Sequence, residues 1–185
     1  MCVKNILSMN DHPLLYNPVY KALISGDQHL GHGNGEVRYF DEEVSPFAGF
    51  ASDNEKGFSE LYDLLPPGRR ILYANPSKIT LPAGWQLQHE IAGLQFVYEG
   101  GEIKKQFAQI IPLLEIHVEE MMDLVRLTKP GPFGKRTIDF GHYHGIFSKG
   151  KLVAMTGQRL HVENYTELSA VCTHPDYLGK GYATI

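Results

Sequence analysis

A strand that stops abruptly near the C-terminal end constrains the fold of this chain more than any other feature. Residues 166–173 alternate polar with small apolar side chains, and the apolar positions are Leu168, Ala170 and Cys172. A period of two is typical of a β-strand that packs on one face, so we expect these three side chains to point inward. Pro175 ends the run, because proline has no backbone N–H for a sheet hydrogen bond and fixes its own φ. The sequence therefore predicts a strand at 166–173 and a break directly after it.

A glycine-containing turn follows the break, in the order Leu178-Gly179-Lys180-Gly181-Tyr182-Ala183-Thr184. The two glycines tolerate positive φ and let a ligand approach the backbone, while the lysine adds a positive charge. If the chain enters a helix here, the helix adds its positive dipole end, and several N–H groups can converge on one phosphate. An ordinary surface loop is the alternative interpretation of the same glycines.

Two other phosphate-binding motifs are excluded. A Walker loop needs a glycine and a Ser or Thr at the positions that His174 and Gly181 occupy. A dinucleotide-binding fingerprint needs a βαβ unit behind its glycines, and none is predicted before this turn.

The complete string from Val171 to Ala183 resembles the acyl-CoA-binding motif of the GNAT N-acetyltransferase superfamily. That motif is commonly written Arg/Gln-x-x-Gly-x-Gly/Ala, and Gly181 and Ala183 take its last two marked positions. Leu178 stands where the family usually has Arg or Gln, which is a departure. The departure is small in consequence, because in this family backbone N–H groups hold most of the pyrophosphate. The resemblance begins near Gly145 and becomes faint upstream of it.

The resemblance implies an α/β (α+β) fold with a mixed, mostly antiparallel sheet flanked by helices. It implies acetyl-CoA as the cosubstrate and no metal. The pantetheine arm would pair with the exposed backbone of the strand before the glycines, as an added strand would. The residues implied for acetyl-CoA binding are Val171, Cys172, Thr173, Leu178, Gly179, Lys180, Gly181, Tyr182, Ala183 and Thr184.

The reaction implied by the resemblance is transfer of an acetyl group to a primary amine of a small molecule or peptide by direct attack. The amine must be neutral to attack, so a carboxylate acting directly or through water would take its proton. Glu167 is the candidate base, and a charged residue on the solvent face of a strand is the alternative interpretation. A backbone N–H near Val171 or Cys172 would stabilise the developing oxyanion. Cys172 is not expected to be a covalent nucleophile, because no base accompanies it in the sequence.

A complete domain of this superfamily continues beyond the glycine turn, whereas this chain ends at Ile185. We therefore expect a truncated chain, completion of the fold by a partner, or loss of catalysis. Loss of catalysis makes a non-catalytic acyl-CoA-binding or interaction module the alternative function. Apolar surface left uncovered by a short helix would favour association into a homo-oligomer.

Composition limits the classes of partner and location. The 185 residues are 43% hydrophobic, enough to bury a core for one domain or two small ones. A net charge of −4 argues against a nucleic-acid partner. Cys2 and Cys172 suggest no disulfide framework and fit a cytoplasmic protein. No apolar run reaches transmembrane length, so we expect no membrane partner, and the expected partners are acetyl-CoA and an amine acceptor.

The part of the chain before the motif predicts a mixture of helices and strands. Its predicted elements are a short helix from Asn17-Pro18, a glycine-rich turn at 31–35, a helix at 58–65, and strands at 36–40, 70–74 and 87–98. We divide the chain into 1–100, an α/β region compatible with a degenerate GNAT-like half, and 101–185, the GNAT acyl-CoA-binding region, which is incomplete at its C-terminal end.

The second region predicts helices followed by hairpins. Residues 102–127 are helical in character, and Pro112 divides them, so a second helix with a solvated acidic face is expected at 114–127. The loop 129–134 would shape the acceptor pocket. Turns at 148–151 and 163–164 would join strands at 146–147, 152–160 and 166–173 into three consecutive antiparallel strands.

Two histidine pairs raise the question of a zinc site. His29 with His32, and His142 with His144, have spacings that a metal could use. Neither pair has further His or Cys residues nearby to complete a tetrahedral set, so we expect no metal.

Overall fold

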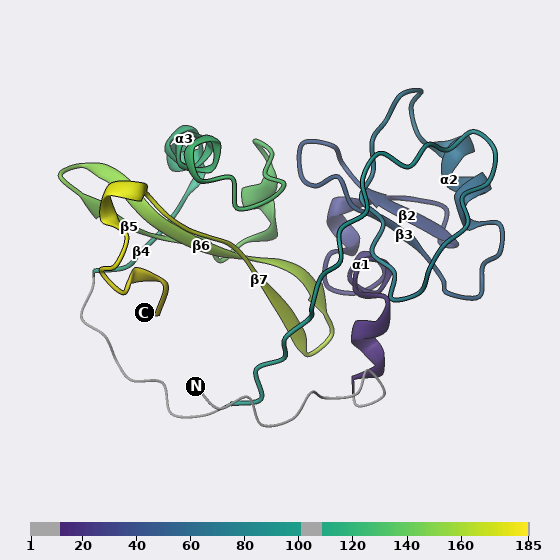
Figure 1. The fold of residues 1–185 in the computed structure, drawn as a ribbon, viewed down its shortest axis with the longest axis horizontal. Coiled ribbons are helices and arrows are strands. Elements are labelled where there is room, and N and C mark those ends of the chain that lie inside the picture. The colour runs from purple at the N-terminus through teal and green to yellow at the C-terminus, as the bar shows by residue number, and fades with distance from the viewer. Residues whose placement is uncertain (1–11, 101–108, 185) are drawn as a thin grey trace.

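The computed structural model of the chain is described for residues 12–100 and 109–184. Within these ranges it contains two antiparallel sheets (Figure 1). The smaller sheet has the order β1-β2-β3, with strands at Gly31–Gly33, Val37–Phe40 and Ala48–Phe50. The larger sheet has the order β4-β5-β6-β7, with strands at Ile111–Pro112, His144–Ser148, Lys151–Val162 and Tyr165–Thr173. The predicted α+β class with a mostly antiparallel sheet is confirmed.

The described ranges form the α-helices α1 (Pro18–Leu23), α2 (Gly57–Leu64) and α3 (Val118–Thr128). α3 lies across β6 and β7, and α1 lies against β6 of the larger sheet and against the smaller sheet (Figure 1). Short 3-10 helices lie at Pro13–Tyr16, Gln28–Leu30, Glu115–His117, Thr137–Phe140, Pro175–Tyr177 and Tyr182–Thr184. In the part of the chain that the structure describes, no helix is both long and apolar enough to cross a membrane.

α1 begins where the sequence predicts. Asn17 is its N-cap position and Pro18 its first residue, where the missing N–H of proline costs nothing. The Asn17 side chain does not cap the helix; its Nδ2 donates to the carbonyl of Phe50 at 2.7 Å. This hydrogen bond ties the start of α1 to the end of β3.

The main core contains residues from both sides of the predicted boundary at 100/101. Buried apolar side chains of α1, β2, α3 and β6 share this cluster, among them Val19, Leu23, Phe40, Met121, Leu124 and Met155. A second cluster fills the space between the smaller sheet and α2, with Phe50 and Leu61 buried in it. Residues 101–108, next to the boundary, lie outside the described residues, and both the boundary and the degenerate first half stay predictions.

A buried carboxylate joins the first half of the chain to the larger sheet. Asp27 is 1% exposed and its Oδ2 accepts from the backbone N–H of His161 at 2.9 Å. Its Oδ1 lies 2.6 Å from Nδ1 of the same histidine. The N–H of Gly26 donates to the His161 carbonyl at 3.2 Å, and a Cβ on Gly26 would lie only 2.6 Å from the Cβ of His161. Glycine therefore permits this close approach of the chain to β6.

Four predicted elements differ in the structure. The first part of the predicted glycine-rich turn at 31–35 is strand β1, because Gly31–Gly33 pair with β2. The predicted strand at 70–74 is reduced to a single bridge between Leu72 and Phe47, because Pro67 and Pro76 flank a run too short to extend further. The predicted strand at 87–98 is not formed, because its apolar residues change parity at Gly93 and neither face is continuous.

The first segment of the helix predicted at 102–127 is also wrong in the residues that the structure describes. Residues 102–108 lie outside the described residues, and Ile111–Pro112 form β4 instead, paired with β5. Proline cannot continue a helix but is tolerated in an edge strand such as this one. The second segment is confirmed, because α3 and the 3-10 turn before it cover Glu115–His117 and Val118–Thr128.

The two predicted hairpins are confirmed. Between β5 and β6, Lys149 and Gly150 have φ values of 52° and 74°, the pair of positive values that matches the twist of a tight hairpin. Between β6 and β7, Glu163 has a φ of 49°. β5, β6 and β7 are consecutive antiparallel strands that lead into the glycine turn.

Candidate functional site

β7 carries a bulge that changes which of its side chains share a face. Glu167 pairs with Arg159 and Cys172 pairs with Met155, so six residues of β7 (167–172) oppose five of β6 (155–159). The extra residue lies at the register shift next to Ala170, whose φ is 52°. Glu167 and Cys172 therefore face the same side although their spacing is odd.

The expected inward position of Leu168 is wrong for the same reason. Its side chain is 72% exposed, whereas Ala170 is buried. The prediction assumed strict alternation of side chains along residues 166–173. The extra residue at the bulge interrupts that alternation, so the residues before it face the opposite side from the one expected. In this way the structure places Glu167 on the partly buried face.

Arg159 forms a two-point ion pair with Glu167. Nε of Arg159 donates to Oε2 at 2.9 Å, and Nη2 donates to Oε1 at 2.7 Å. The guanidinium also lies over the ring of Phe47 from the first half of the chain, 4.8 Å from its centroid. The Arg159 side chain is 15% exposed and that of Glu167 is 39% exposed. The candidate base is thus held in place by a largely desolvated cation.

Tyr143 lies on the same face, with its ring against Gly157, two positions before Arg159 on β6. Its residue is 2% exposed and its hydroxyl is buried without a hydrogen-bond partner. Burial raises the pKa of Tyr143, while the charge of Arg159 lowers it and that of Glu167 raises it, so the ring lies within the field of both. The ring fits because residue 157 is glycine: a Cβ there would lie 2.2 Å from Cε1 of Tyr143.

The loop predicted to shape an acceptor pocket reaches this face. Phe133 from that loop makes an edge contact with Tyr143, with the ring centroids 5.8 Å apart. The structure therefore brings together Glu167, Arg159, Tyr143, Phe47 and Phe133. Sequence reasoning named Glu167 and the loop but missed Arg159 and Tyr143. A regular hairpin closed at 163–164 would place Leu160 opposite Glu167. A register shift between Arg159 and His161, where Leu160 has a φ of 49°, brings Arg159 there instead, and no residue type in the sequence indicates that shift.

The glycine turn has the backbone conformation that the sequence predicts. Gly179 and Gly181 have φ values of 76° and 75°. The described residues after them form the 3-10 helix Tyr182–Thr184. Tyr177 and Tyr182 pack against buried residues of β5 and β6, which fixes the turn to the sheet. Nζ of Lys180 lies 4.5 Å from the centroid of the Tyr177 ring.

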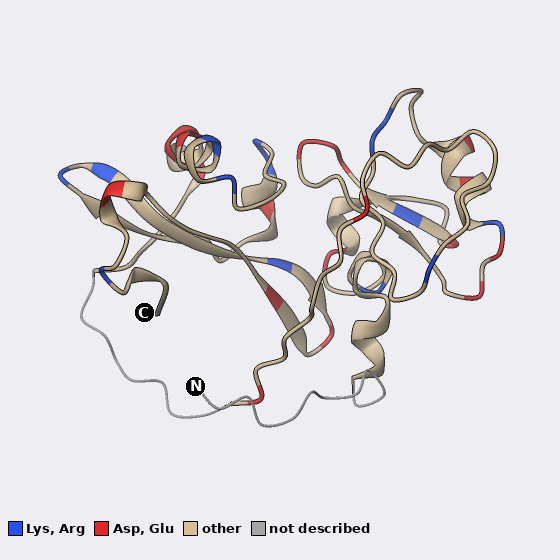
Figure 2. Ribbon diagram, in the orientation of Figure 1, with Lys and Arg blue, Asp and Glu red and all other residues tan. Residues whose placement is uncertain are grey.

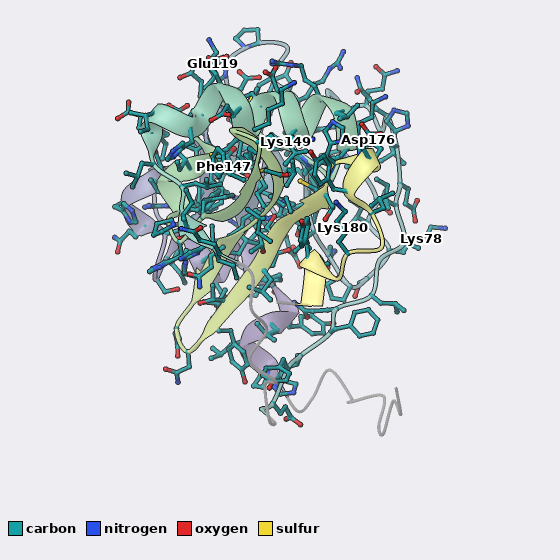
Figure 3. All side chains as sticks on the ribbon, turned by 90° about the vertical axis from the view of Figure 1, so that its left-hand side faces the viewer. Lys78, Glu119, Phe147, Lys149, Asp176 and Lys180 are labelled. Carbon is teal, nitrogen blue, oxygen red and sulfur yellow. The ribbon has the colours of Figure 1, made fainter. Side chains whose placement is uncertain are left out.

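β7 is the outer strand of the larger sheet within the described ranges, and the turn follows its end. Val171 is exposed on this strand, and Cys172 and Thr173 are half-buried. Figure 3 shows Asp176, in the 3-10 helix before the turn, and Lys180 of the turn at the end of the sheet where Lys149 also lies. Leu178 and Ala183 are exposed beside the glycines.

The thiol of Cys172 is shielded. Burial raises its pKa, and hydrogen bonds with the Thr128 side chain and the Met155 backbone lower it by less. A thiol with a raised pKa holds little thiolate at neutral pH, which is the form that acts as a nucleophile.

Charged groups are dispersed around the molecule. Figure 2 shows acidic and basic residues interspersed along both halves of the chain. Glu119 points outward on α3, as expected for a solvated face (Figure 3). Among the described residues, no group of three or more His, Cys, Asp and Glu could hold a metal ion.

Comparison with known proteins identifies the family of the chain. No protein-family model matches the chain, and no curated protein matches it. A crystal structure from Novosphingobium aromaticivorans DSM 12444, of a protein placed among the acetyltransferases of the GNAT family, aligns with a TM-score of 0.76. The two sequences are 30% identical, and the alignment covers 92% of this chain and 75% of the neighbour. Fold, sequence identity and coverage agree with the motif at 171–183, and the chain belongs to the GNAT family.

Proposed function

We propose that the protein is an N-acetyltransferase that moves an acetyl group from acetyl-CoA to a primary amine of a small molecule or peptide. One observation carries the proposal: the outer strand β7 leads through the 3-10 helix Pro175–Tyr177 into a turn whose two glycines both have positive φ. An unpaired strand edge suits a ligand that carries amides, and a glycine turn suits one that carries phosphates. Acetyl-CoA has both parts in one molecule.

The residues present fit acetyl-CoA. The backbone of Val171, Cys172 and Thr173 would pair with the amides of the pantetheine arm, and residues 178–184 would hold the pyrophosphate. A Cβ on Gly179 would meet nothing within 4 Å, so its neighbourhood is open to a ligand. Lys180 adds a cation there. When bound, acetyl-CoA supplies an activated acyl thioester.

Glu167 would remove the proton from the attacking amine. The two hydrogen bonds from Arg159 hold the carboxylate in one orientation on the face that also carries Tyr143. A positioned base of this kind contributes about 10²–10⁴-fold to rate. Backbone N–H groups near Val171 or Cys172 would stabilise the negative charge that develops on the carbonyl oxygen. No step requires a metal, and the free thiol of Cys172 suits a cytoplasmic location.

The first test measures the melting temperature of the protein during titration with acetyl-CoA, with ATP and NAD as controls. We expect stabilisation that rises with acetyl-CoA alone, because a ligand that binds only the folded state raises its stability by mass action. Gly179→Val and Gly181→Val should abolish the shift, because a β-branched residue cannot hold a φ near 75°. Gly68→Val is the matched control: Gly68 has a φ of 80° and open surroundings but lies outside the site. No shift in the unmodified protein would contradict the proposal.

The second test separates catalysis from binding. Glu167→Gln should reduce the turnover number with an amine panel by about 10²-fold or more while leaving the acetyl-CoA shift intact. Binding of acetyl-CoA without turnover of any amine, and without an effect of Glu167→Gln, would instead identify a non-catalytic acyl-CoA-binding or interaction module.

A further inference from the structure

The ion pair between Arg159 and Glu167 uses only part of the guanidinium. Nε and Nη2 bind the carboxylate, and Nη1 takes no part in the pair. The aromatic ring of Phe47 holds the guanidinium on one side. Arg159 is thus fixed by two neighbours and retains N–H donors for a second anion, because a guanidinium offers five donors.

The hydroxyl of Tyr143, on the same face of the sheet, supplies a second donor. A buried hydroxyl without a partner costs free energy, and native structures rarely leave one unless a ligand or water completes it. Here the ring is kept in position by Phe133 and by the absence of a side chain at Gly157. A ligand oxygen next to Arg159 would accept from this O–H.

The charges of the ion pair define the complementary ligand. Arg159 and Glu167 present one positive and one negative group side by side on neighbouring strands, at a directly opposed register pair. A ligand with an ammonium and a carboxylate separated by one or two carbons can contact both partners at once. A simple amine would engage Glu167 alone and leave the remaining donors of Arg159 without an acceptor, which is costly for a largely buried group.

We propose that the acceptor is an amino acid, bound through its carboxylate by Arg159 and the Tyr143 hydroxyl, with its amino group directed to Glu167. The inference rests on the proposed function, because it names the acceptor of that reaction. Arg159 is then the residue that selects carboxylated amines: its Nη1 takes the ligand carboxylate, while Nε and Nη2 keep Glu167 oriented toward the amino group.

The test measures binding by saturation-transfer NMR and titration, with and without saturating CoA. The probes are glycine, β-alanine, L-alanine and L-phenylalanine, each compared with its carboxamide, which keeps the amine and loses the negative charge. We expect the amino acids to bind and the amides to bind at least about tenfold more weakly, since one hydrogen-bonded charge pair is worth about that factor or more.

Variants of the two donors sharpen the test. Arg159→Met keeps the aliphatic stem against Phe47 and should reduce amino-acid affinity about 10–100-fold. Arg159→Lys should restore part of it, and Tyr143→Phe should reduce it by a smaller factor. Arg126→Met is the matched control, because Arg126 also pairs with an acidic residue, Asp123, but lies on the exposed side of α3.

The outcomes distinguish this inference from the proposed function. Equal binding of amides and acids, unchanged affinity in Arg159→Met, or no binding of any amino acid to the unmodified protein would overturn the amino-acid site. Acetylation of simple amines but not of amino acids would overturn it as well and leave the transferase standing. Amino-acid binding that depends on Arg159, without acetyl transfer, would retain the site and remove the transferase.

Discussion

Cys172 occupies a position on β7 where the backbone would serve a ligand while the side chain is shielded. Because burial raises its pKa, we expect Cys172 to react with iodoacetamide at pH 8 about tenfold more slowly than in the unfolded chain. The rate should rise with pH over a range above that of an exposed cysteine, because the thiolate appears later. Peptide mapping by mass spectrometry, with the protein in urea as the control, separates Cys172 from Cys2. Equal rates in the folded and unfolded chain would show that the thiol is accessible.

At the scale of single residues, the sequence identified one partner in each of two contacts at the site. It identified Glu167 but not Arg159, and the loop that carries Phe133 but not Tyr143. Glu167 could be predicted because a carboxylate beside a recognisable motif has a chemical role to fill. Arg159 and Tyr143 could not be recognised as site residues from the sequence. Arg159 stands out because its charged side chain is largely buried, and Tyr143 because its buried hydroxyl has no hydrogen-bond partner. Neither property has a signature in residue type or spacing.

Gly157 shows how one element depends on its neighbour. A methyl group on this residue would lie 2.2–2.5 Å from ring atoms of Tyr143, which is inside van der Waals contact. We expect Gly157→Ala to lower the free energy of unfolding by about 1–3 kcal/mol, the usual cost of overpacking. Chemical denaturation monitored by circular dichroism measures the change.

The matched control for this prediction is Gly93→Ala. A Cβ on Gly93 would meet nothing within 4 Å, and the residue is exposed, so the expected change is within about 0.5 kcal/mol. If both variants lose the same stability, crowding of Tyr143 is not the cause.

At the scale of elements, the sequence predicted strands and helices well where periodicity ran unbroken. α2, α3, β5, β6 and β7 lie where expected. The side-chain orientation of Leu168 could not be predicted, because the bulge near Ala170 places an alanine at a φ of 52°. Alanine gives no warning of such a conformation, whereas glycine would have.

At the scale of the whole molecule, the shared core predicts cooperative unfolding. Trp85 is the only tryptophan of the chain and packs against Phe58 and Tyr62 in the first half. Its fluorescence therefore reports on that half, and far-UV circular dichroism reports on both. We expect the two thermal transitions to coincide, because the main core includes side chains from both halves.

Asp27→Ala provides the contrasting variant for this experiment. It removes the carboxylate that accepts from His161 and leaves the N–H and ring of that histidine without their partner. We expect the whole protein to lose about 1–3 kcal/mol and the two transitions to separate. Transitions that already differ in the unmodified protein would show that the two halves unfold independently.

The organisation of the molecule was only partly visible in its sequence. The α+β class and the order of the last three strands followed from local patterns and from the motif. The common core could not be predicted, because it depends on contacts such as that between Asp27 and His161, which are 134 positions apart. No local pattern carries information about such a pair.

The outer edge of β7 also bears on how the protein behaves at high concentration. Leu168 and Val171 are 72% and 49% exposed on this strand, and within the described ranges no further strand pairs with its outer N–H and C=O groups. Such an edge is a template on which a second chain can add a strand, and proteins with open edges tend to precipitate. A ligand lying along β7 would occupy the same hydrogen-bonding groups. The concentration of that ligand would then determine how long the protein stays in solution without aggregating, in addition to the rate of the reaction.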